Sequence, residues 1–334
     1  MKLTFPDITE EEYRADEAIA NSDFKHATSP IELKDYKAGK LEKKETAYFS
    51  FGTHFEDYLV MSTNEFNTKY CVVEELPKSP SGFNQITFVE QVAALMDISL
   101  DTPTNEELTA IYNNIYKTKD DKKGSKSKKL YDEYKDYISF ERDSREKLTT
   151  EYVEQLEYRK KAVLKLPLWN ELMSKEVYYQ PTMGIEPRIK TNGVFIKGKP
   201  DWIIVDNENK VIYILDLKTT GKPIGDFEYS FRKFKYDRQL AFYKKLLQHH
   251  ISLEGFEVYE KYADYSIKAM ILAVESGYPG YAKFIPIPTR VMKHGNELFA
   301  KDLERVKQYL TSNRLEHEHD GQLVFNWNAY EPKE

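Results

Sequence analysis

The order of apolar and polar residues indicates a mainly helical first half of the chain. Residues 51–62 predict the start of a helix, and the mostly apolar residues 84–99 predict another. Thr104 has Glu107 three residues after it, which is the spacing of a capping box at the start of a further helix. A charged helical run follows to about residue 175. Before these helices we expect a short N-terminal arm with a turn at Ser29-Pro30.

The pattern changes at residue 176, where extended segments replace the helices. The β-branched run VIYILDLKTT is typical of a strand, whereas YDRQLAFYKKLLQ is amphipathic with helical spacing. Strands joined by a hairpin, then a helix, then further strands predict an α/β (mixed α+β) fold with a central mixed sheet flanked by helices. The predicted elements are strands in 177–185, 188–206, 211–220, 266–276 and 282–289, a turn at 207–209, and helices at 226–250 and 291–312.

Composition excludes several classes of protein. The 334 residues carry a formal charge of -6, which argues against a generally basic nucleic-acid coat but permits a local basic groove. The single cysteine, Cys71, excludes an intrachain disulfide framework and any four-thiolate zinc or iron–sulfur site built from this chain alone. No run approaches 18 apolar residues and the N-terminal stretch lacks an apolar signal core. We therefore expect no membrane span, no secretion and a reducing cytoplasmic location.

A lysine-rich run, Lys117–Lys129, lies between two predicted helices. It contains seven lysines and two aspartates. One interpretation is a solvated loop, and the other is a contact with the phosphate backbone of a nucleic acid, which needs charge but little fixed geometry. If the second holds, neutralising four of the lysines should flatten the salt dependence of binding.

The chemistry centres on two carboxylates and one lysine. Gly198-Lys199-Pro200-Asp201 precedes Asp216-Leu217-Lys218 by fifteen residues. Alternation along a strand places Asp216 and Lys218 on one face, and a hairpin can bring Asp201 beside them. Carboxylate oxygens are the ligands that Mg²⁺ and Mn²⁺ prefer, so this is a candidate metal site. The alternative is a strand end that reaches the surface and carries ordinary solvated charges.

Two further features accompany this cluster. His54 lies near the start of the helix predicted at 51–62. Gln239 and Tyr243 are spaced i,i+4 on one helical face, and Tyr236 joins that face three residues before Gln239. Taken alone, each feature is also compatible with a purely structural role.

Together these residues resemble the motif series of a known nuclease group. In order, Gly52-Thr53-His54, Gly198 to Asp201, Asp216 to Lys218 and Gln239 to Tyr243 are similar to the motifs of the RecB-type branch of the PD-(D/E)xK nucleases. The details, including the string IANSDFKHATSP, look closest to the RecE-like (exodeoxyribonuclease VIII-like) exonucleases of phages and prophages. The resemblance covers roughly residues 18–60 and 185–250. The histidine motif is one residue shorter than is usual in the group.

The resemblance implies a restriction-endonuclease-like core with a helical insertion, and roles for individual residues. Residues 1–100 would form the N-terminal helical part with the histidine motif, 101–175 the lysine-rich helical insertion, and 176–334 the nuclease core. Asp201, Asp216 and Lys218 would be catalytic. The implied metal ligands are His54, Asp201, Asp216 and the carbonyl of Leu217; Gln239, Tyr243 and Tyr236 would orient the site or touch DNA; Glu186, on a strand before the hairpin, is a weaker acidic candidate.

The implied activity is Mg²⁺- or Mn²⁺-dependent digestion of linear duplex DNA, 5′ to 3′, in phage-type recombination or DNA repair. The resemblance also implies a single-strand annealing recombinase as partner, a ring-shaped homo-oligomer, and the cytoplasm of a bacterial host or phage-infected cell as location. One cysteine excludes the members with an iron–sulfur cluster, and the lack of a Walker A string excludes a helicase motor. Two alternatives stay open: a structure-specific or single-strand endonuclease of the RecB-like group, and a non-catalytic DNA-binding protein on a nuclease fold.

Overall fold

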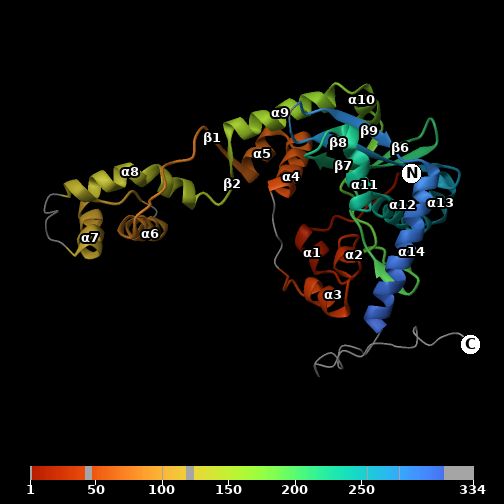
Figure 1. The fold of residues 1–334 in the computed structure, drawn as a ribbon, viewed down its shortest axis with the longest axis horizontal. Coiled ribbons are helices and arrows are strands. Elements are labelled where there is room, and N and C mark those ends of the chain that lie inside the picture. Colours follow the sequence, from red (N-terminus) through yellow and green to blue (C-terminus); the bar gives the residue numbers. More distant parts are fainter. Residues whose placement is uncertain are drawn as a thin grey trace, which may run out of the picture. The chain divides into compact units, whose positions relative to one another are not determined.

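The computed structural model describes residues 2–41, 47–99, 101–117, 124–253, 255–277 and 279–311. It divides the chain into two compact units, which are treated separately below (Figure 1). The helical unit comprises residues 57–158, and the sheet unit comprises 1–56 together with 159–334. The sequence places the divisions at 100/101 and 175/176 instead. The structure differs because the helix at 83–99 shares its apolar core with the two helices that follow it.

The helical unit is built around a small apolar core. Phe88, Val92, Leu108, Tyr134 and Ile138 are its fully or nearly fully buried members. The elements wholly within the unit are α5 (Thr63–Lys69), β1 (Tyr70–Val73), α6 (Phe83–Ser99), α7 (Asn105–Tyr116), α8 (Ser125–Arg142) and β2 (Glu146–Thr149), and β1 pairs with β2 in parallel.

The predicted capping box is confirmed at the start of α7. The Thr104 hydroxyl accepts a hydrogen bond from the Glu107 backbone N–H at 3.3 Å, and the Glu107 carboxylate accepts one from the Thr104 N–H at 2.8 Å. Of the lysine-rich run, residues 118–123 lie outside the described residues. Lys126, Lys128 and Lys129 are exposed in the first turns of α8.

The sheet unit contains a five-stranded mixed sheet of order β3-β6-β7-β8-β9. The strands β7 and β8 are parallel and the other neighbours are antiparallel, as the hairpin–helix–strand pattern predicts. A separate hairpin, β4-β5, precedes β6. The strands are β3 (Glu176–Tyr179), β4 (Ile189–Thr191), β5 (Val194–Ile196), β6 (Trp202–Asp206), β7 (Val211–Thr220), β8 (Ser266–Glu275) and β9 (Ala282–Pro286).

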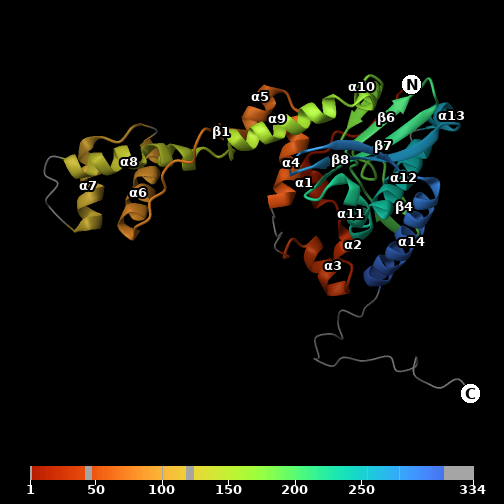
Figure 2. The same ribbon diagram turned by 45° about the horizontal axis from the view of Figure 1, so that its top comes forward.

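Helices surround this sheet (Figure 2). They are α1 (Glu10–Ala15), α2 (Asp23–His26), α3 (Pro30–Lys37), α10 (Pro167–Met173), the 3-10 helix η1 (Ile224–Asp226), α11 (Phe227–Lys233), α12 (Tyr236–Leu253), α13 (Phe256–Tyr262) and α14 (Thr289–Thr311). The helices α4 (Ala47–Val60) and α9 (Thr150–Leu164) each begin in one unit and end in the other.

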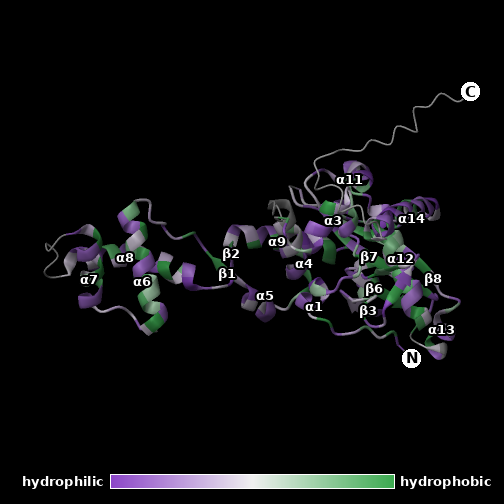
Figure 3. Cartoon of the chain, turned by 90° about the horizontal axis from the view of Figure 1, so that it is seen from below, coloured by the Kyte–Doolittle hydropathy of each residue, from purple (hydrophilic) through white to green (hydrophobic). Residues whose placement is uncertain are grey.

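Alternation assigns the two faces of the sheet. Ile203 and Ile212 belong to the large core that α12 shares with the strands, whereas Trp202 packs edge-to-face on Trp169 of α10 at 5.7 Å. Side chains two residues apart on a strand point the same way. Asp201 and Asp216 therefore lie on the face that α12 covers. Figure 3 shows the strands as predominantly hydrophobic, in keeping with a sheet buried between helices.

The predicted helix at 226–250 is two helices rather than one, which corrects the prediction. α11 ends at Lys233 and α12 begins at Tyr236. Lys235 between them has a left-handed backbone with φ of 54°, and such a residue interrupts a right-handed helix.

At Ser29-Pro30 the predicted turn is a helix start, since the Ser29 hydroxyl accepts a hydrogen bond from the Glu32 N–H at 3.1 Å. None of the helices in the described ranges combines the length and apolar character needed to cross a bilayer.

Candidate active site

The hairpin β6-β7 brings Asp201 and Asp216 side by side. Trp202 pairs with Leu215 in antiparallel register, so Asp201, directly before β6, falls opposite Asp216. The backbone N–H of Leu217 donates to a carboxylate oxygen of Asp201 at 2.5 Å. The side chain of Asp216 is only 1% exposed. Two acidic groups thus meet at one buried point of the sheet, as the motif spacing predicts.

Lys218 supplies the positive charge at this point. Its ammonium pairs with Asp216, donates to the Leu217 carbonyl at 3.3 Å, and lies 5.2 Å from the ring centre of Tyr236. Burial alone would lower the pKa of this lysine, but the charges of Asp216 and Asp201 outweigh it and hold the pKa above its ordinary value. The ammonium is therefore protonated at neutral pH.

The helix α12 adds Gln239 and Tyr243 to the cluster. The Gln239 amide donates to Asp216 at 3.3 Å and to the Tyr243 hydroxyl at 3.1 Å. Burial, with the nearby charges of Asp216 and Asp201, raises the pKa of Tyr243 well above its ordinary value, so the phenol stays neutral. The amide thus fixes the carboxylate and the phenol with respect to each other.

Gly198 allows α12 to approach the strand segment that ends in Asp201. A Cβ at this position would lie 2.6 Å from Leu246 Cδ1 and 3.2 Å from Tyr243 Cε1. Any larger residue would therefore displace α12 and with it the Gln239–Tyr243 pair. The glycine of the Gly-x-x-Asp motif is explained by this close packing.

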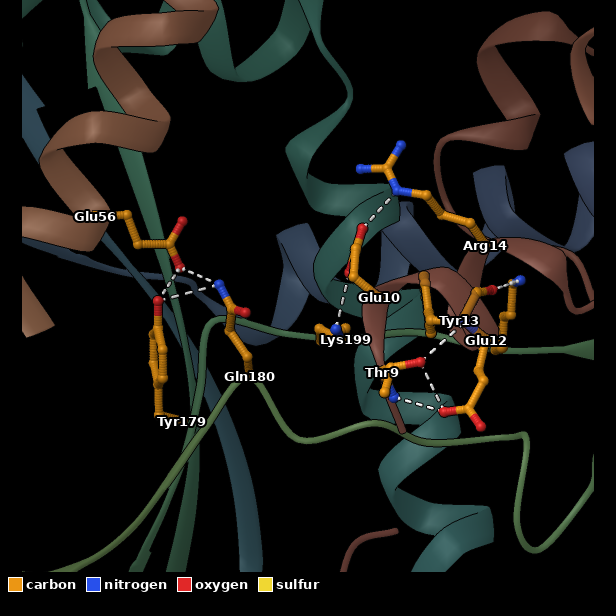
Figure 4. Close-up of polar contacts among 10 residues, drawn as sticks. Thr9, Glu10, Glu12, Tyr13, Arg14, Glu56, Tyr179, Gln180 and Lys199 are labelled. Atoms are coloured by element: carbon orange, nitrogen blue, oxygen red, sulfur yellow. Dashed lines mark hydrogen bonds and ion pairs between the residues drawn. The ribbon is translucent and has the colours of Figure 1, made fainter. Parts of the chain in front are cut away.

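Glu56 of α4 is a third carboxylate at the site, one that the sequence motifs did not predict. Its Oε1 accepts hydrogen bonds from the Gln180 amide at 2.9 Å and the Tyr179 hydroxyl at 3.3 Å (Figure 4). Burial raises the pKa of Glu56, and the negative charge of Asp216 raises it further. The same helix packs on the end of β7, where a Cβ on Gly52 would lie 3.2 Å from Thr219 Oγ1. In the sequence, the one indication of Glu56 is its position two residues after His54.

His54 and Glu186 differ in their surroundings. His54 is buried in α4, two residues before Glu56. Glu186 is exposed in the turn before β4, so its predicted place on a strand is wrong. The chain turns there because Gly184 has a φ of 86° and its Cα lies too close to the Ile196 carbonyl for a side chain.

The electrostatics of the cluster fit a divalent cation. Burial raises the pKa of Asp201 well above its ordinary value, and the charges of Asp216 and Glu56 add to the shift. Asp201, Asp216 and Glu56 thus bring three acidic groups together beside Lys218, and a bound cation would relieve their repulsion. Within the described ranges, no three His, Cys, Asp or Glu side chains are grouped so as to hold one metal ion. Asp201, Asp216 and the Leu217 carbonyl are nevertheless a suitable oxygen set, because Mg²⁺ commonly takes one or two carboxylates and completes its shell with water.

A second cation, Lys25, lies near the cluster. Partial burial lowers its pKa, and the positive charges of Lys218 and Arg238 lower it further. Its neighbour Phe24 anchors the segment by packing edge-to-face on Phe242 of α12 at 5.8 Å. The sequence string IANSDFKHATSP contains Lys25, but nothing in the sequence alone places it beside Lys218.

Comparison with known proteins identifies the family. Residues 89–320 match the family model described as the PD-(D/E)XK nuclease superfamily, and this match covers well over half of the chain. The chain belongs to this superfamily, whose members generally use divalent metals such as Mg²⁺.

Among solved structures, a crystal structure named "Putative exonuclease" from Eubacterium rectale is similar over 98% of this chain and 96% of that chain, with a TM-score of 0.49 and 12% sequence identity. A search of curated proteins finds no match.

Proposed function

We propose that this protein is a divalent-metal-dependent deoxyribonuclease that digests linear duplex DNA as an exonuclease. The observation that carries the proposal is the convergence of Asp201, Asp216 and Lys218 at one buried point, braced by Gln239 from α12. Membership of the nuclease superfamily gives the reaction class, which is hydrolysis of a phosphodiester bond.

Each side chain has a role that follows from its surroundings. Asp201 and Asp216 would hold the metal, which supplies a water of lowered pKa and neutralises phosphate charge. Lys218, whose pKa the charges of Asp216 and Asp201 hold above its ordinary value, would stabilise negative charge on the phosphate. Gln239 fixes the orientation of the Asp216 carboxylate through its amide. Glu56 adds negative charge that favours a cation in the cluster.

The finer features of the proposal rest on the resemblance to RecE-like exonucleases. They are 5′ to 3′ polarity, a role in phage-type recombination or repair, a homo-oligomeric ring, and delivery of the product to a single-strand annealing recombinase in the bacterial cytoplasm. In this proposal His54 of α4 is an additional metal ligand. Tyr236 and Tyr243 orient the site or touch the DNA strand.

The test compares linear duplexes labelled at the 5′ or the 3′ end with nicked circular and branched DNA, all in Mg²⁺. A 5′ to 3′ exonuclease releases the 5′ label at once as mononucleotide. It degrades nicked circular DNA more slowly than linear duplex. Preferential cutting of branched DNA would instead favour a structure-specific endonuclease. No cleavage of any substrate, together with no Mn²⁺ binding that depends on Asp201 and Asp216, would favour a non-catalytic DNA-binding protein.

A further inference from the structure

Residues 222–234, which contain η1 and α11, expose two aromatic rings with two lysines beside them. Tyr229 is 57% exposed and Phe234 is 45% exposed. The Lys222 ammonium lies 4.2 Å from the Tyr229 ring centre. The Lys233 ammonium lies 5.8 Å from the Tyr229 ring centre and 5.5 Å from that of Phe234. These four residues are called the aromatic platform below.

The aromatic platform is connected to the candidate active site through ring contacts. The Phe234 ring lies 5.8 Å from Tyr236, and Tyr236 lies 5.2 Å from the Lys218 ammonium. Buried Phe227 also stacks on Tyr236, at 6.0 Å between ring centres, and holds α11 beside α12 (Figure 1). Phe234 therefore rests on packed rings that lead to the Asp216–Lys218 pair, and the Lys233 ammonium links Phe234 to the Tyr229 ring.

The composition of the aromatic platform matches one ligand in particular. Single exposed aromatic residues are ordinary on protein surfaces, but here two rings and two cations share one short segment. Within residues 222–234, Glu228 pairs with Arg232, and the three cations Lys222, Arg232 and Lys233 outnumber the two acids Asp226 and Glu228, so the segment carries a net positive charge. Rings stack on unpaired bases and lysines attract phosphates, which is how proteins bind a single strand without reading its sequence. In a duplex the bases are stacked inside and cannot reach the rings.

We propose that the aromatic platform binds a single-stranded segment of DNA and leads that strand toward the Asp216–Lys218 pair. The inference rests on the proposed function for its ligand, since a nuclease needs a path for the strand it cuts. It goes further by assigning the substrate form at this surface, a strand already separated from its complement. Binding here involves no metal and no cleavage, so it can be tested separately from activity.

The first experiment measures fluorescence anisotropy of a labelled single-stranded oligonucleotide in EDTA, where cleavage cannot occur. Replacing both rings (Tyr229→Ala with Phe234→Ala) should weaken binding about tenfold or more, because each stacked base contributes ~1–3 kcal/mol. Tyr229→Phe should bind normally. An oligonucleotide with abasic sites should bind weakly to the wild type and equally weakly to the double variant, because it has no bases to stack.

A matched control comes from the hairpin β4-β5. Phe195 is 44% exposed and lies 5.5 Å from the Arg188 guanidinium and 5.0 Å from the Lys190 ammonium. Phe195→Ala therefore removes a similar ring among similar charges and should leave single-strand affinity unchanged. If Phe195→Ala lost as much affinity for single-stranded DNA as the double ring variant, any exposed ring would have the same effect. That result would overturn the assignment of the strand to the aromatic platform.

The lysines are tested by their effect on salt dependence. Lys222→Gln with Lys233→Gln should lower the slope of log affinity against log salt by ~0.7 per lysine, the value for single strands. The double ring variant should leave this slope unchanged. The proposal is overturned if the ring variant binds single strands normally, or if it loses as much affinity for blunt duplex as for single strands. If the protein binds single strands through the aromatic platform but cleaves no DNA, the nuclease proposal is contradicted, whereas the proposal for the aromatic platform still holds.

Discussion

Replacing Lys218 by methionine tests whether this ammonium balances a buried carboxylate. Lys218 is 18% exposed and its partner Asp216 is 1% exposed. Methionine keeps most of the side-chain volume, so the main effect is the loss of charge next to Asp216. Removing one partner of a buried pair costs ~3–5 kcal/mol. We expect about 3 kcal/mol, the lower end of that range, because Gln239 still donates to Asp216 and the lysine is partly exposed.

The same variant should respond strongly to a divalent cation. Without the ammonium, the negative charge of Asp216 beside the acidic groups of Asp201 and Glu56 is less compensated, so bound Mg²⁺ should stabilise the variant more than it stabilises the wild type. At a free Mg²⁺ concentration of about 100 times the dissociation constant, binding stabilises the folded state by ~2.7 kcal/mol. Mg²⁺ should therefore recover most of the lost stability while activity stays absent.

The assay is urea unfolding followed by tryptophan fluorescence, with EDTA or with Mg²⁺. Trp169 and Trp202 pack together between α10 and β6, so they report on the sheet unit. Lys199→Met is the matched control: Lys199 is also 18% exposed, but its partner Glu10, 3.0 Å away, is 57% exposed (Figure 4). Such a surface pair contributes ~0–1 kcal/mol. Two outcomes would refute the charge-balance role of Lys218: an equal loss of unfolding free energy in the two variants, or a stabilisation by Mg²⁺ in Lys218→Met no larger than in the wild type.

Three further predictions concern packing, orientation and charge. Gly295→Ala should destabilise the sheet unit by ~1–3 kcal/mol in urea, because its Cβ would lie 2.2 Å from the Asp237 carbonyl oxygen, whereas Gly225→Ala meets nothing within 4 Å and should change little. Gln239→Leu should lower the cleavage rate by about 10- to 100-fold at unchanged fold, as loss of a residue that orients a metal ligand does. Neutralising four lysines of Lys117–Lys129 should flatten the salt dependence of duplex binding if the run contacts phosphates, and an unchanged slope would favour a solvated loop.

The core of the candidate site could be predicted from the sequence because its determinants are local. Alternation on β7 sets Asp216 and Lys218 on one face, and the hairpin turn sets the register that brings Asp201 opposite Asp216. The i,i+4 spacing of Gln239 and Tyr243 gives their shared face on α12. Each of these relations needs only the geometry of one element or one turn.

The remaining features depend on packing between distant segments. Glu56 reaches the site because α4 lies against the end of β7, and Lys25 because Phe24 packs on α12. The break at Lys235 requires a left-handed residue that the local pattern does not reveal. The structure divides the chain elsewhere than the sequence does, because α6 shares its apolar core with α7 and α8, and such contacts between helices cannot be read from the sequence of α6.

The most direct test of the central claim is Mg²⁺-dependent release of nucleotides from linear duplex DNA by the wild type and by Asp216→Asn. Tryptophan fluorescence and urea unfolding first establish that the variant is folded, since Asp216 is buried and paired with Lys218. We expect the wild type to release nucleotides only with the metal, and the folded variant to release none. Release by the folded Asp216→Asn protein at the wild-type rate would contradict the assignment of the active site to the Asp201–Asp216–Lys218 cluster.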